Sequence, residues 1–196
     1  AFTLIEIYLF STGLAHSIAQ VMLGGSWLIV LGGFMIVSWI ATHLAQSSRS
    51  MGAQYGALAG FVVAEAIVFV PLLFMAQEVA PGVIENAATL TLVGFAGLTA
   101  VAFQTRRDFS FLGGILRWGF ISALVLIVGS VLFGFNLGVL FSVAMIVLAG
   151  GAILYDTSNV LHHYPEDRHV GAALQLFASV ALLFWYVLRL LMSMRD

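Results

Sequence analysis

Seven apolar stretches of close to 20 residues follow one another along this chain and limit its fold more than any other feature. We place them at residues 2–24, 27–46, 52–75, 87–103, 109–132, 137–160 and 170–191. A helix of about 20 residues crosses a hydrocarbon core about 30 Å thick. Charged residues make up only 8% of the 196 positions, whereas a soluble domain carries roughly a quarter. The sequence predicts an all-α integral membrane protein with seven transmembrane helices, folded as one domain over residues 1–196.

The residue types that the chain lacks exclude several classes of protein. It has no cysteine, and all seven basic residues are arginine, so no lysine amine is present to form a retinal Schiff base. No basic run suggests nucleic acid. The HExxH and GxSxG patterns of membrane hydrolases are absent, and an aspartyl protease needs a second carboxylate beside Asp156. We therefore expect a protein that is not an enzyme and holds no cofactor and no metal.

The distribution of arginine between the connections predicts the orientation. Cytoplasmic connections carry an excess of arginine and lysine. The second, fourth and sixth connections hold Arg49, Arg106, Arg107 and Arg168, whereas the third holds Glu78 and Glu85. The N-terminus is then cytoplasmic and the C-terminus periplasmic. Arg189 and Arg195, near the outer end, count against this orientation.

The third predicted helix carries small residues at four-residue intervals, at Gly52, Gly56, Gly60 and Ala64. Such spacing aligns small residues on one face, where a neighbouring backbone can approach closely. We interpret this face as a helix-packing seam.

Five ionisable side chains are predicted inside the membrane, where each costs about 2.5–3.5 kcal/mol on insertion scales. At about 1.5 Å per residue, Glu6, Arg117 and Asp156 fall roughly 5–13 Å deep from the cytoplasmic side. His16 and Glu65 both fall near the midplane. These two residues could form a proton-exchanging pair, and a neutral, hydrogen-bonded Glu65 is the alternative.

Asp156 is the strongest candidate for function, because it lies in the polar run Tyr155-Asp156-Thr157-Ser158-Asn159 of an otherwise apolar helix. A buried carboxyl of this kind can sense protons or bind a cation. The alternative is a structural pair with Arg117, unless Arg117 only extends to the inner surface. The segment from His162 to His169 holds three imidazoles and two carboxylates, but it lacks the standard ligand spacing, so we interpret it as a solvated loop.

Two sequence blocks carry a resemblance to a known family. They read RDFSFLGG at residues 107–114 and GAILYDTSN at residues 151–159, and the closing helix from Ala173 to Arg189 fits with them. Together they resemble the Bax inhibitor family, and more narrowly its proteobacterial YccA-type branch. The resemblance implies two layers of three helices around the C-terminal helix.

The resemblance also implies two candidate activities. Some members look like pH-sensitive calcium leaks gated by an aspartate pair on the last two helices, whereas the YccA-type branch modulates the FtsH-type AAA protease. Asp156 matches the first aspartate, but the second position aligns with Ser179. Because two carboxylates can exchange a shared proton for a divalent ion, Ser179 weakens the calcium hypothesis and favours the protease partner. A structural accessory subunit is a third possibility.

Proteases of the FtsH type engage an exposed cytoplasmic tail. The sequence starts with Ala1 rather than methionine, which favours a tail that precedes Ala1 over a chain that lacks one. The bacterial inner membrane is the expected location.

Overall fold

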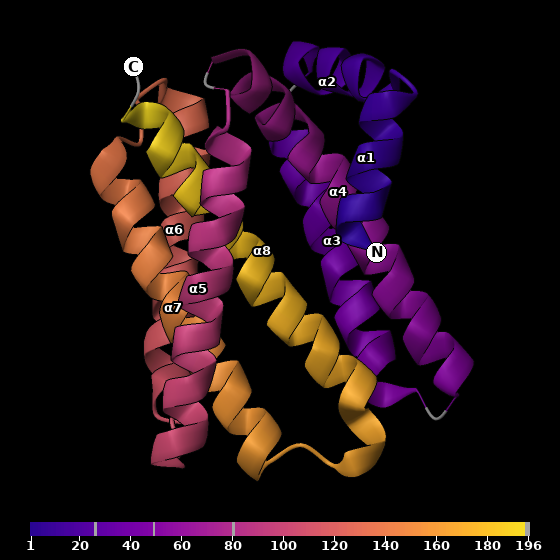
Figure 1. Ribbon diagram of the computed structural model, residues 1–196, viewed down its shortest axis with the longest axis vertical. Helices are drawn as coiled ribbons and strands as arrows, with labels where there is room; N and C mark the ends of the chain where they lie inside the picture. Colours follow the sequence, from indigo (N-terminus) through magenta and orange to yellow (C-terminus); the bar gives the residue numbers. More distant parts are fainter. Residues whose placement is uncertain (26, 49, 80, 195–196) are drawn as a thin grey trace. The chain divides into compact units, whose positions relative to one another are not determined.

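The computed structural model describes residues 1–25, 27–48, 50–79 and 81–194, and within these ranges every regular element is helical (Figure 1). The elements are α1 (Phe2–Ser11), α2 (Leu14–Gly24), α3 (Trp27–Ser47), α4 (Met51–Val79), α5 (Val83–Thr105), α6 (Leu112–Phe133), α7 (Val139–His162), a short 3₁₀ helix η1 (Glu166–Arg168) and α8 (His169–Ser193). The all-helical class predicted from hydropathy is confirmed.

Six of these helices, α3 to α8, are long and apolar enough to cross a membrane, and the bent pair α1 and α2 makes seven if it counts as one span. The chain is thus a multi-pass membrane protein. The predicted third span extends to Val79 and includes Pro71, which removes one backbone donor without ending the helix.

The first predicted span, residues 2–24, is not one straight helix, because α1 and α2 meet at an angle of 94°. Gly13 lies between them with φ +77°, in the left-handed region that glycine adopts most readily. The hydroxyls of Ser11 and Thr12 donate hydrogen bonds to the carbonyl oxygen of Tyr8, at 3.1 and 2.7 Å. The backbone N–H of Thr12 donates to the same carbonyl at 3.0 Å, so the two hydroxyls add to the last backbone bond of α1, and the helix ends at the left-handed Gly13.

The helices form two compact units, Ala1–Pro81 and Gly82–Asp196. In the first unit α4 packs against α1, α2 and α3, and Val70 of α4 contacts a cluster that includes Leu9, Ala15 and Ala19. In the second unit α5 packs against both α7 and α8, and α6 packs against α7. The single domain and the two layers around the C-terminal helix stay predictions.

Contact between α7 and α8 is the most extensive in the second unit. Near one end of this contact Tyr186 of α8 is buried together with Met145 of α7 and Ala123 of α6. The ring of Phe141 meets that of Tyr186 edge to face, with centroids 5.9 Å apart. This packing holds α7 and α8 in the register that aligns their polar residues.

Candidate functional site

The buried pair of Asp156 and Ser179 lies between α7 and α8. The Ser179 hydroxyl donates a hydrogen bond of 2.5 Å to Oδ2 of Asp156, and each residue is only 8% exposed. Hydrogen bonds to an acidic side chain are short and strong. Ser179 therefore contacts Asp156 directly, but it supplies a hydroxyl and no second negative charge.

Next to this pair, Ser158 joins α7 to the connection between α5 and α6. The backbone N–H of Phe109 donates to the Ser158 hydroxyl at 2.9 Å, and that hydroxyl donates to the carbonyl oxygen of Arg107 at 3.4 Å. Ser158 is fully buried. The two sequence blocks that suggested a family are thus in direct contact, since Arg107 and Phe109 belong to one and Ser158 to the other.

Asp108 organises the exposed side of the same connection. The backbone N–H of Ser110 donates to Oδ1 of Asp108 at 2.9 Å, and Nε2 of His163 lies 3.6 Å from Oδ2. The Ser110 hydrogen bond is the main reason that the pKa of Asp108 is below its usual value, and the nearby imidazole of His163 adds to this effect. Sequence reasoning missed this contact, although Asp108 stands in the first block and His163 follows the second.

Glycines let α6 approach α7 beside this site. A Cβ at Gly113 would lie 3.1–3.3 Å from ring atoms and the hydroxyl of Tyr155, and one at Gly151 would lie 3.3 Å from Leu116. Distances this short leave no room for a methyl group unless the neighbouring side chain moves. The glycines of both blocks therefore serve helix packing around the Asp156 region.

Arg117 does not pair with Asp156. Its side chain is exposed, and within the described part of the chain its guanidinium forms no ion pair. The hypothesis of a buried Asp156–Arg117 pair is therefore wrong for this fold.

Arg189 has a local role, because its Nη2 donates to the carbonyl oxygen of Leu137 at 2.9 Å and so ties α8 to the connection before α7. Arg49 and Arg195, which entered the predicted orientation, lie outside the described residues.

His16 of α2 packs against α4 at a level well separated from Glu65. The side-chain amide N–H of Gln20 donates to Nε2 of His16 at 2.8 Å, and the imidazole packs on Phe74, with ring centroids 5.5 Å apart. Phe74 is nine residues beyond Glu65, or about 13.5 Å along the helix axis. The 94° bend before α2 separates the two residues that counting along a straight helix had placed at one depth.

The predicted seam of Gly52, Gly56 and Gly60 makes no close helix contact within the described chain. All three glycines are exposed, and a Cβ added at Gly56 or Gly60 would meet no atom within 4 Å. The face that packs against α3 is a different one, marked by Phe61, whose ring meets Phe34 with centroids 5.9 Å apart.

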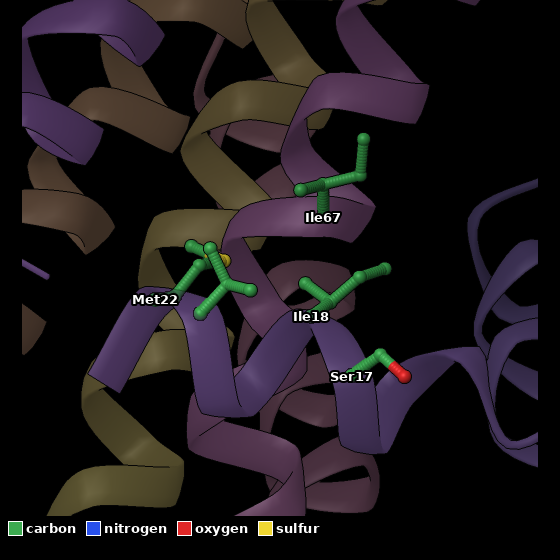
Figure 2. A pocket seen from close by; sticks show the side chains of 5 residues that line it. Ser17, Ile18, Met22 and Ile67 are labelled. Carbon is green, nitrogen blue, oxygen red and sulfur yellow. The ribbon is translucent and has the colours of Figure 1, made fainter. Parts of the chain in front are cut away.

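An open pocket of about 360 Å³ lies between α2 and α4, and its close view shows Ile67 above the α2 side chains (Figure 2). Its lining consists of Ser17, Ile18, Val21, Met22 and Ile67. These side chains are apolar apart from one hydroxyl and include no titratable group. The pocket therefore offers no chemistry, and Asp156 with Ser179 remains the candidate site.

These features define a multi-pass helical membrane protein with one buried carboxyl–hydroxyl pair between its last two helices. Residues 1–196 match the family model Bax1-I, described as "Inhibitor of apoptosis-promoting Bax1". The chain belongs to the Bax inhibitor family, as its two sequence blocks had suggested.

Three relatives show how far this similarity extends. An uncharacterised protein of Pseudomonas aeruginosa is 30% identical over 165 residues, which cover 83% of this chain and 72% of the relative. Bax inhibitor 1 of Schizosaccharomyces pombe is 32% identical over 147 residues, which cover 72% of this chain and 51% of the relative. The modulator of FtsH protease YccA of Escherichia coli is 33% identical over 110 residues, which cover 56% of this chain and 50% of the relative. The matched part of the chain thus spans about half the length of the two relatives whose names state a role.

Proposed function

We propose that this chain is a non-enzymatic protein of the bacterial inner membrane that binds and modulates an FtsH-type membrane protease. The observation that carries the proposal is its 33% identity to a protein named as a modulator of FtsH protease. A second E. coli protein with the same identity is named as an inner membrane protein.

The geometry of the candidate site supports a modulator better than a calcium gate. Exchange of a proton for a divalent ion is favoured where two carboxylates share a site, and Asp156 is bonded to the neutral hydroxyl of Ser179. A buried hydrogen bond between α7 and α8 holds the two helices together without supplying a second charge. In this proposal Asp156 and Ser179 maintain the helix packing on which partner binding depends.

The partner would engage the cytoplasmic side of the chain. With the N-terminus cytoplasmic and the C-terminus periplasmic, the connections that carry Arg106, Arg107 and Arg168 face the cytoplasm. The α5–α6 connection is held in place there by Ser158 and Asp108. A fixed, positively charged connection of this kind is a suitable contact for a membrane-bound protease.

The test measures the half-life of an FtsH membrane substrate in cells that lack the protein and in cells that carry it on a plasmid. We expect the half-life to change on deletion and to return with the wild-type chain, which should co-purify with the protease from mild detergent. Ser158→Ala should weaken both effects, and Ser193→Ala, an exposed serine near the end of α8, is the control. Unchanged substrate half-lives in the deletion strain would rule the proposal out.

A proton-regulated cation leak at Asp156 is the second candidate. The observation that favours it is the burial of the Asp156 carboxyl within a membrane-spanning helix. Liposomes that contain the protein should then show calcium flux that depends on pH and is lost in Asp156→Asn. Ser179→Asp, which builds a second carboxyl at the same place, should increase the flux. Absence of flux at every pH in both the wild type and Ser179→Asp would eliminate this candidate.

A further inference from the structure

Arg117 is the only charged residue in the sequence of α6, and it takes no part in the site at Asp156. It lies five residues, or about 7.5 Å, beyond the first residue of the helix, in a segment long and apolar enough to cross a membrane. Its side chain is exposed and forms no ion pair with the residues that the structure describes. A charged side chain inside the membrane is costly unless a polar group compensates it, so Arg117 needs a partner from outside the chain.

The surface of α6 near Arg117 is suited to lipid. The buried residues Leu116 and Ala123 mark the side of the helix that packs on α7. Large apolar side chains are exposed on the same stretch of the helix as Arg117: Phe111, Ile115, Trp118 and Ile121. Hydrocarbon chains cover such a surface in a membrane-spanning helix, so the compensating group has to come from the lipid itself.

The start of α6 leaves room for the Arg117 side chain to reach the headgroups. A long side chain on a helix extends over the turn that precedes it, and here Gly113 and Gly114 form that turn. A Cβ at Gly114 would meet no atom within 4 Å, so the guanidinium can extend along α6 towards the α5–α6 connection. Trp118 is 71% exposed beside it, and tryptophan favours the level of the headgroups.

We propose that Arg117 binds the phosphate of an anionic phospholipid at the end of α6 that follows the α5–α6 connection. A guanidinium is planar and can donate two parallel hydrogen bonds to one phosphate. A zwitterionic lipid neutralises its own phosphate with the ammonium group of its headgroup, so an anionic lipid is the better partner. This site does not involve Asp156, and it is independent of both functions proposed above and of the orientation of the chain.

The experiment uses Trp118 as a reporter of the lipid beside Arg117. The full-length chain contains four tryptophans, and Trp27→Phe, Trp39→Phe and Trp185→Phe leave Trp118 alone. The protein is reconstituted in vesicles of phosphatidylglycerol and phosphatidylcholine, with one of the two lipids brominated on its acyl chains, because bromine quenches indole fluorescence only at short range. We expect an apparent preference of about fivefold for phosphatidylglycerol at Trp118, the effect of one basic residue near an anionic headgroup.

Variants assign the preference to Arg117. Arg117→Gln should abolish it, whereas Arg117→Lys retains the charge and should keep most of it. Arg106→Gln combined with Arg107→Gln removes the exposed arginines of the α5–α6 connection and should leave most of the preference at Trp118.

The matched reporter is a chain that keeps only Trp39. This tryptophan is exposed on α3, whose sequence contains no arginine, so it should show no preference. Equal quenching of Trp118 by the two lipids with Arg117 in place would overturn the proposal, even if Arg117→Gln did not fold. A preference that survives in Arg117→Gln, or that is equally strong at Trp39, would also overturn it, because the anionic lipid would then be attracted by other parts of the protein.

Discussion

Ser179 donates a hydrogen bond of 2.5 Å to Asp156 across the contact of α7 and α8, although 23 positions separate the two residues. Both side chains are buried, so the bond is not exchanged for one to water. The hydroxyl therefore links α7 to α8 without placing a second negative charge beside Asp156.

Removal of this hydroxyl should destabilise the protein. In Ser179→Ala the buried Asp156 loses its donor, at a cost of about 1–3 kcal/mol. The measurement is the unfolding midpoint in detergent, monitored by circular dichroism. Ser193→Ala is the control on the same helix, because Ser193 is exposed and bonds only to the carbonyl of Leu190; its effect should be within about 0.5 kcal/mol. Equal midpoints for the two variants would show that the Asp156 bond contributes nothing.

Loss of the Ser158 hydroxyl should loosen the α5–α6 connection. Ser158→Ala leaves the N–H of Phe109 without its acceptor and frees the carbonyl of Arg107. Amide hydrogen exchange at residues 106–111 should become at least severalfold faster, because local opening requires less free energy. Ser142→Ala changes another buried serine of α7, 16 residues away, and should leave this segment unchanged. Protection that survives in Ser158→Ala would contradict this role.

The same connection should depend on pH through Asp108. Folding lowers the pKa of this carboxyl, mainly through the N–H of Ser110. A group whose pKa is lowered in the folded state stabilises it above the unfolded pKa, near 3.9 for aspartate, and this contribution disappears as the pH falls through the folded pKa. Proteolysis by an acid-active protease at residues 106–111 should therefore increase below about pH 4.

Asp108→Asn tests the assignment of this pH dependence. The variant should already show faster cleavage above about pH 4, within the working range of the same protease, and should lose the step below this pH. Asp167→Asn, an exposed aspartate of the α7–α8 connection, should keep it. A step that remains in Asp108→Asn would assign the effect to another group.

Two adjacent glycines should respond differently to the same substitution. A methyl group at Gly113 would press on the ring of Tyr155, whereas one at Gly114 would meet no atom within 4 Å. Both changes gain the same helix propensity, so the difference between them isolates the contact. We expect Gly113→Ala to be less stable than Gly114→Ala by about 1 kcal/mol or more, measured as a difference in unfolding midpoint. Matching stabilities would mean that Tyr155 moves aside freely.

The predicted orientation can be tested directly, because the chain contains no cysteine. Single cysteines at Asp108 and at Glu85 introduce thiols near opposite ends of α5. In intact cells a membrane-impermeant maleimide that reaches the periplasm should label Glu85→Cys and leave Asp108→Cys unlabelled until the cells are lysed. The reverse pattern would place the arginine-bearing connections outside.

Hydropathy was sufficient to predict where the helices lie in the sequence, but it did not predict the bend in the first apolar run. The apolar runs around α3 to α8 are long enough that burial in lipid forces them to be helical, since only a helix satisfies its own backbone there. The run from Phe2 to Gly24 is as apolar as the others, but it bends by 94° at Gly13, whose φ is positive. The Ser-Thr-Gly sequence carried that signal, and hydropathy averaged over the whole run conceals it.

The two sequence blocks and Asp156 were recognisable from the order of residues alone, because hydropathy and short motifs are properties of neighbours in the chain. The partners of these residues were decided by tertiary structure. Asp156 bonds to Ser179 rather than to Arg117, and Ser158 holds Phe109 from 49 positions away. Which side chains meet depends on helix rotation and register, and these are set by packing such as that of Tyr186 on Phe141 and by close approach at Gly113. The sequence by itself thus determined a helical membrane protein with Asp156 as its candidate functional residue. The packing of α7 against α8 decided that the Ser179 hydroxyl is bonded to this carboxyl.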